Sequence, residues 1–148
     1  MDLSFEEKSA WVNTVIVLLL FGYYFGEVFG AEVLGPAATL GLLFRVVLAV
    51  VVIEIVVHVV MAIAHRPEGT DERDVLVSAK SARNGGMVLG VAVFGAIGYS
   101  LFGGAIHHAT QVCNPDVIAK TAHLLVLGAV AGELTRCASQ LFYYRQGV

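Results

Sequence analysis

Residues 46–64 read VVLAVVVIEIVVHVVMAIA, an aliphatic run that only Glu54 and His58 interrupt. At a rise of about 1.5 Å per residue, a helix of roughly 20 apolar residues crosses the hydrocarbon core of a bilayer. The run therefore predicts a transmembrane helix with Glu54 near the middle of the membrane. Because a spanning helix satisfies its own backbone hydrogen bonds, the groups that need partners on neighbouring helices are these two ionisable side chains.

The composition of the whole chain is typical of a membrane protein. Of its 148 residues, 57% are hydrophobic and 14% are charged, and the mean hydropathy is +0.79. This is more apolar surface than a soluble core of the same size buries, so the lipid bilayer is the expected surrounding. The net charge of -3 is small and mixed in sign, which argues against a nucleic-acid partner.

Helix signals divide the chain into four apolar segments. Ser4 and Glu7 have the spacing of a capping box, which predicts a first helix from Phe5. Pro36 suits the first turn of the second helix, and Pro115 suits the first turn of the fourth. We therefore predict an all-α fold in which four transmembrane helices form an antiparallel bundle within one domain, residues 1–148. The predicted spans are about 11–30, 38–64, 86–106 and 118–142, with a cytoplasmic loop at 65–84.

The positive charges predict the orientation of the chain in the membrane. With four spans, both termini and the 65–84 loop lie on the same side. An excess of Lys and Arg marks the cytoplasmic side, so both termini are predicted to be cytoplasmic. The basic residues of these segments are Lys8, Arg66, Arg73, Lys80, Arg83 and Arg145.

The 65–84 loop contains a further helix signal. Thr70 suits an N-cap, and the DERD run that follows places acids where the helix dipole favours them. This helix either lies along the membrane surface, with a break at Gly85 and Gly86, or continues directly into the third span. The DERD side chains are either a solvated helix start or a site that binds a cytoplasmic protein partner or a divalent ion; they are Asp71, Glu72, Arg73 and Asp74.

A set of polar residues is predicted to meet at one depth in the membrane. Glu54 and His58 are one helical turn apart and share a face of the second span. Glu133 and Arg136 recur on one face of the fourth span, and Asn13 reaches a comparable depth in the first. One interpretation is a proton or ion site, because a carboxyl group in a low dielectric favours its protonated form and imidazole titrates near neutral pH. The other is a structural network in which Arg136 neutralises Glu133 and His58 hydrogen bonds to Glu54.

A second polar group is predicted on the opposite side of the membrane. Imidazole, thiolate and carboxylate are the ligands that zinc or copper prefers in proteins. The spacing matches no dedicated metal motif, so the alternative is a set of solvated loop residues and interfacial anchors. The candidate ligands are Cys113, Asp116, His123, His107 and His108.

Small residues on the fourth span predict a close helix contact. Gly128 and Gly132 have the spacing that lets two helix backbones approach each other in lipid. This face packs either against the third span or against the same helix of a second copy. Because four spans leave little interior room, a homodimer is the expected assembly.

Three motifs resemble an uncharacterised group of small bacterial four-span membrane proteins. They are the opening SFEEKSAW at residues 4–11, the DERD loop at 71–74 and the ending SQLFYYR at 139–145. The resemblance covers nearly the whole chain and implies the bacterial inner (cytoplasmic) membrane as the location. It implies no activity and no catalytic residue.

The chain contains no nucleophile arrangement, phosphate-binding loop or cofactor fingerprint, so a non-enzymatic protein without a cofactor is expected. The leading hypothesis is a membrane protein that transports or senses protons, ions or a small cationic solute through its intramembrane polar set. One alternative is an accessory or regulatory membrane subunit that binds a cytoplasmic partner through residues 65–84. The other is a metal-binding membrane protein.

Overall fold

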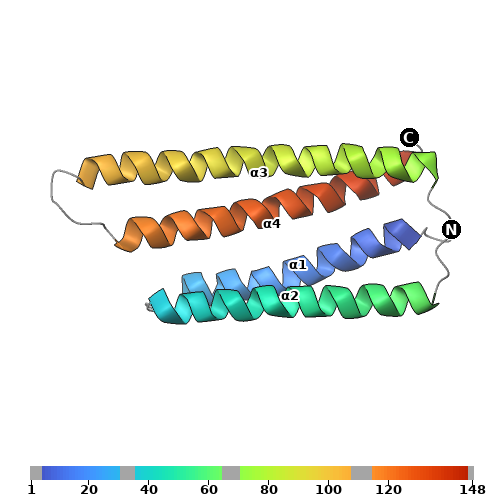
Figure 1. Cartoon of the computed structure of the whole chain (residues 1–148), viewed down its shortest axis with the longest axis horizontal. Coiled ribbons are helices and arrows are strands. Elements are labelled where there is room, and N and C mark those ends of the chain that lie inside the picture. Colours follow the sequence, from blue (N-terminus) through green and yellow to red (C-terminus); the bar gives the residue numbers. More distant parts are fainter. Residues whose placement is uncertain (1–4, 31–35, 65–70, 108–114, 147–148) are drawn as a thin grey trace. The chain divides into compact units, whose positions relative to one another are not determined.

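The computed structural model of the chain describes residues 5–30, 36–64, 71–107 and 115–146, and these residues form four long helices (Figure 1). All four helices are long and apolar enough to cross a membrane. The predicted all-α class with four spanning helices is therefore confirmed, and the chain is a multi-pass membrane protein. The helices are α1, Phe5–Gly30; α2, Pro36–Ala64; α3, Glu72–His107; and α4, Pro115–Gln146.

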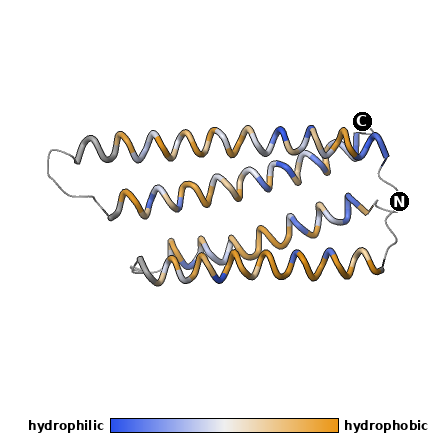
Figure 2. The backbone as a smooth tube through the Cα atoms, viewed as in Figure 1, coloured by the Kyte–Doolittle hydropathy of each residue, from blue (hydrophilic) through white to orange (hydrophobic). Residues whose placement is uncertain are grey.

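The surface of the helices is apolar, as lipid contact requires. Figure 2 shows that α2 is hydrophobic along most of its length, whereas polar residues gather at the starts of α1 and α3. Ile63 on α2 is 80% exposed, and Val46 is the one buried residue among the α2 side chains that the structure describes. Because lipid tails are as apolar as these side chains, packing and polar contacts must hold the helices together in place of the hydrophobic effect.

The chain divides into two compact units. Unit 1 comprises residues 1–81 and 137–148, and unit 2 comprises residues 82–136. Unit 1 therefore contains α1 and α2, which pack against each other, together with the first turns of α3 and the last turns of α4. Unit 2 contains the remaining parts of α3 and α4.

One face of α1 forms much of the interior of unit 1. Its buried residues are Ala10, Asn13, Val17 and Tyr24, and they are spaced by three, four and seven residues, which places them on one side of the helix. Leu19, between them in sequence, is 69% exposed. This rotation of α1 turns the Asn13 amide away from lipid.

Helix α3 begins at Glu72 and continues without interruption to His107. Most of the predicted 65–84 loop is therefore the first part of this helix, and the direct continuation into the third span is the alternative that the structure adopts. Thr70, the predicted cap, lies outside the described residues. Asp71 caps the helix: its Oδ1 accepts from the Glu72 amide at 2.7 Å, and its own amide donates to Asp74 Oδ2 at 3.4 Å.

Contacts that we call the terminal clasp join the start of α3 to the end of α4 within unit 1. The Tyr144 hydroxyl donates to Asp74 Oδ1 at 2.9 Å. Arg73 Nη2 donates to the carbonyl oxygen of Tyr144 at 3.1 Å, and the guanidinium lies 5.9 Å from the centre of the Tyr144 ring. Lys80 Nζ lies 5.7 Å from the centre of the Tyr143 ring. Through Arg73, the clasp supplies a hydrogen-bond donor to the Tyr144 carbonyl oxygen. Carbonyl groups in the last turn of a helix lack a donor within their own helix.

Tyr144→Phe should destabilise the protein, because it leaves Asp74 Oδ1 without the phenol. We expect a loss of about 1 to 2 kcal/mol in the free energy of unfolding, measured in detergent by circular dichroism with increasing dodecyl sulfate. Tyr23→Phe, at a tyrosine that is 55% exposed, is the control and should change little. Equal losses in the two variants would contradict a stabilising clasp.

Candidate functional site

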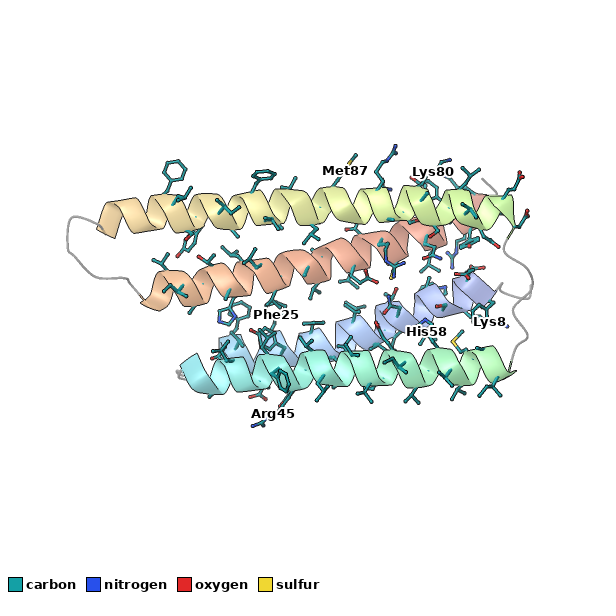
Figure 3. All side chains as sticks on the ribbon, viewed as in Figure 1. Lys8, Phe25, Arg45, His58, Lys80 and Met87 are labelled. Atoms are coloured by element: carbon teal, nitrogen blue, oxygen red, sulfur yellow. The ribbon has the colours of Figure 1, made fainter. Side chains whose placement is uncertain are left out.

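His58 is held between two helices inside unit 1. Its Nδ1 lies 2.7 Å from the backbone carbonyl oxygen of Glu54, and its Nε2 lies 2.8 Å from Ser9 Oγ on α1. The His58 site, as we call these three residues, lies about 9 Å from the end of α2 at 1.5 Å per residue. Figure 3 labels His58 near the end of the α1 and α2 pair where Lys8 also lies. The imidazole is half-buried.

The hydrogen bonds define the proton positions on the ring. The Glu54 carbonyl can only accept, so Nδ1 carries a hydrogen. In the neutral ring Nε2 then accepts, and Ser9 Oγ donates to it. When Nε2 binds a proton it becomes a donor, and the Ser9 hydroxyl can turn to accept. His58 can therefore gain or lose a proton with a hydrogen bond on both nitrogens in each state.

Helix geometry explains half of this arrangement. Residues four apart lie one above the other on a helix, and a side chain leans toward the amino-terminal turn, which brings the His58 ring over the Glu54 carbonyl. His58 thus bonds to the backbone oxygen of Glu54, whereas the sequence pattern predicted a bond to the Glu54 side chain. Sequence reasoning missed Ser9. A signal was present, because Ser9 lies one helical turn before the polar residue Asn13.

Asn13 connects α1 to the last turns of α4. Its side chain is 7% exposed, and Nδ2 donates to Cys137 Sγ at 3.4 Å. Cys137 is completely buried. Helix α1 thus bonds to α2 through Ser9 and, one turn further into the membrane, to α4 through Asn13.

Glu133 and Arg136 form an ion pair within α4. Arg136 Nε lies 3.1 Å and 3.0 Å from the two carboxylate oxygens, and Nη2 lies 2.5 Å from Oε1. The two side chains are about one-third exposed, at 35% and 36%. Each charge is neutralised by its neighbour three residues away on the same helix. Both residues belong to unit 2 and the His58 site belongs to unit 1, so the meeting of all the predicted polar residues in one layer stays a prediction.

The DERD residues take part in two structural contacts. Asp71 caps α3, and Arg73 and Asp74 belong to the terminal clasp. Glu72 is exposed. A docking role for these four residues stays a prediction.

The predicted metal ligands lie mostly outside the part of the chain that the structure describes. Cys113 and His108 fall in an undescribed segment, and the side chains of His107 and Asp116 are also outside the description. His123 is half-buried on α4. Within residues 5–30, 36–64, 71–107 and 115–146, no three His, Cys, Asp or Glu residues come together in a way that could hold a metal ion. Metal binding by the undescribed residues stays a prediction.

The fold and the His58 site define the class: a multi-pass α-helical membrane protein with a histidine bonded through both ring nitrogens inside its helical interior. Comparison of the chain with models of protein families, with curated proteins and with solved structures found no match.

Proposed function

We propose that this protein binds and releases protons at His58 within the membrane and uses this step to move or sense protons. The observation that carries the proposal is the pair of hydrogen bonds on the imidazole, from Nδ1 to the Glu54 carbonyl and between Nε2 and Ser9. Imidazole is the side chain whose charge ordinarily changes near neutral pH. An ionisable group at membrane depth is commonly part of a proton or ion pathway.

Each neighbour of the imidazole has a role in this proposal. Ser9 exchanges hydrogen-bond direction with Nε2 as the proton arrives and leaves. The Glu54 carboxyl group, one turn deeper in α2, is the next acceptor along the same face. Glu133 and Arg136 keep each other neutralised within α4. Ions or a small cationic solute are the alternative cargo for the same polar groups.

The same proposal includes a location and an assembly. We place the His58 end of unit 1 on the cytoplasmic side because its basic residues gather there: Lys8, Arg73, Lys80 and Arg145. The membrane is the bacterial inner membrane, as the motif resemblance implies. The assembly is a homodimer, since four helices enclose little space of their own.

The proposal is tested by titrating His58 in lipid bilayers. We expect the ¹⁵N signals of its imidazole, identified by their loss in His58→Gln, to report both a neutral and a protonated ring as the pH is varied. The same protein in liposomes with a pH-sensitive dye should show proton flux that falls by about tenfold or more in His58→Gln and in Glu54→Gln. His123→Gln, at a histidine of α4, is the matched control and should retain wild-type flux.

The two measurements separate transport from sensing. A change in the protonation of His58 together with proton flux supports transport. A change in its protonation without proton flux supports sensing. A His58 ring that keeps one protonation state at every pH at which the protein remains folded would overturn the proposal in both forms.

A further inference from the structure

Unit 1 contains a buried polar layer, which we define as Asn13, Ser81, Cys137 and Gln140. Their exposed fractions are 7%, 0%, 0% and 6%, and they come from α1, α3 and α4. Buried polar groups in proteins almost always have hydrogen-bond partners, because an unpaired one loses the hydration that it had in water. The layer therefore requires partners for each of its polar atoms.

Three of these residues, Asn13, Ser81 and Cys137, lie at one level within unit 1. Asp74 on α3 bonds to Tyr144 on α4. About two helical turns further along α3 is Ser81, and about two turns back along α4 is Cys137, each on the same helix face as its clasp residue. Since these two helices run in opposite directions, Ser81 lies level with Cys137. The bond from Asn13 to Cys137 brings α1 to the same level.

Ser81 has a polar atom that the described residues do not satisfy. Its Oγ is buried and has no hydrogen-bond partner among them. The hydroxyls of Thr14, Thr121 and Thr135 each donate to a backbone carbonyl one turn earlier, at 2.7 Å. Ser81 does not make this usual bond, so its hydroxyl is available to a small polar molecule. An internal water, which typically makes two to four hydrogen bonds to protein groups, suits such a position.

Polar groups continue from the layer in both directions within unit 1. Toward the end of the unit, Gln140 hydrogen bonds to Tyr144, and the Tyr144 hydroxyl bonds to Asp74. Asp74 Oδ2 accepts from the backbone amide of the exposed residue Asp71. In the other direction, Asn13 is one turn from Ser9, which bonds to His58. The polar groups thus extend from the exposed start of α3 to the imidazole.

We propose that the polar layer holds internal water and is the route by which protons pass between Asp74 and His58. The part of this proposal that concerns protons rests on the proposed function. In each transfer a water or hydroxyl oxygen accepts a proton from one neighbour and releases another proton to the next. Each group along the route is left unchanged after the proton has passed, and His58 Nε2 gains or loses that proton.

Cys137 offers a native reporter of water in the layer. The sequence has two cysteines, so Cys113→Ser leaves the Cys137 thiol alone to give an S–H stretching band in the infrared spectrum. After transfer of the protein in bilayers to D₂O, a thiol in contact with internal water exchanges its hydrogen rapidly. We expect rapid exchange of the Cys137 S–H group in the Cys113→Ser background.

Two variants of nearly equal shape isolate the Ser81 hydroxyl. Ser81→Thr and Ser81→Val, both in the Cys113→Ser background, add the same bulk, but only threonine keeps a hydroxyl. We expect S–H exchange in Ser81→Val to be slower than in Ser81→Thr by about tenfold or more, because the internal water loses a partner. Ser78→Val, at an exposed serine of the same helix, is the control and should exchange like its parent. If neither variant folds by circular dichroism, Ser81→Ala against the parent replaces the pair, with slower exchange expected.

The outcomes separate this route from the proposed function. Slow exchange in the parent protein, or equal rates in Ser81→Val and Ser81→Thr, would overturn the route even if His58 titrates. Rapid exchange that depends on the Ser81 hydroxyl supports the water layer. If His58 then keeps a single protonation state, the proton part of the route and the proposed function are both overturned, and only the water layer stands. Proton flux that falls in Ser81→Val while the His58 titration remains supports the complete route.

Discussion

Gly85→Ala should destabilise unit 2 strongly, because the added methyl group meets the backbone of α4. A Cβ atom at Gly85 would lie 2.6 Å from the carbonyl oxygen of Gly132 and 3.0 Å from Arg136 Cβ. A backbone oxygen cannot turn aside as a side chain can, so α3 and α4 must separate and lose their close packing. Overpacking of this kind costs about 1 to 3 kcal/mol. We expect a net loss of about 2 kcal/mol after the better helix propensity of alanine is included.

The neighbouring residue provides a matched control for this prediction. A Cβ atom at Gly86 would meet nothing within 4 Å beyond its own stretch of helix backbone among the described residues, so Gly86→Ala should be neutral or should stabilise the helix by up to about 1 kcal/mol. Both variants are unfolded with dodecyl sulfate in detergent micelles and followed by circular dichroism. Similar losses in the two variants would contradict the close approach of α3 and α4 at Gly85.

The second large effect is expected at the ion pair of α4. Arg136→Gln leaves the Glu133 carboxylate without its guanidinium partner in a membrane-spanning helix. Removing one member of such a pair costs about 3 to 5 kcal/mol when the pair is fully buried. Because these side chains are 35% and 36% exposed, we expect a smaller loss, of about 2 to 3 kcal/mol in the free energy of unfolding.

A double-mutant cycle tests whether the pair acts as a unit. Glu133→Gln combined with Arg136→Gln removes both charges, so the double variant should be more stable than Arg136→Gln alone. We expect a coupling energy of at least about 1 kcal/mol. Arg83→Gln, at an exposed arginine of α3, should cost little and serves as the control. Losses that simply add would show that the two charges act independently.

The pairing of Glu133 with Arg136 bears on the function. From sequence, the intramembrane charges fit either a proton site or a structural network. The geometry favours a division of roles: Glu133 and Arg136 pair with each other within one helix, whereas His58 has bonds that suit two protonation states. Both interpretations can therefore apply to different members of the same predicted set.

Local signals predicted the helices well. The structure starts α1 at Phe5, α2 at Pro36 and α4 at Pro115, where capping and proline signals placed them. Proline lacks an amide hydrogen and is therefore favoured in a first turn, where no carbonyl precedes it to accept. The extent of α3 was left between two alternatives, because glycine at residues 85 and 86 permits a break in a helix without requiring one.

The contacts of the candidate site were harder to predict. Hydropathy indicates how deep a residue lies in the membrane, and it led to Asn13, Glu54 and His58. The partners Ser9 and Ser81 were missed, since a single serine in an apolar segment has no distinctive pattern. Serine can bond within its own helix or to another, and sequence does not distinguish the two.

The sequence by itself determined the class of this protein: four apolar segments, each long enough to span a bilayer, with a few ionisable side chains among them. Only the tertiary structure decided which groups these side chains contact, because successive residues point about 100° apart around a helix axis and the packing of the helices selects the inward face. That rotation brings Ser9 to the His58 ring and Asn13 to Cys137. A small rotation of α1 would keep every residue at its depth and break both bonds.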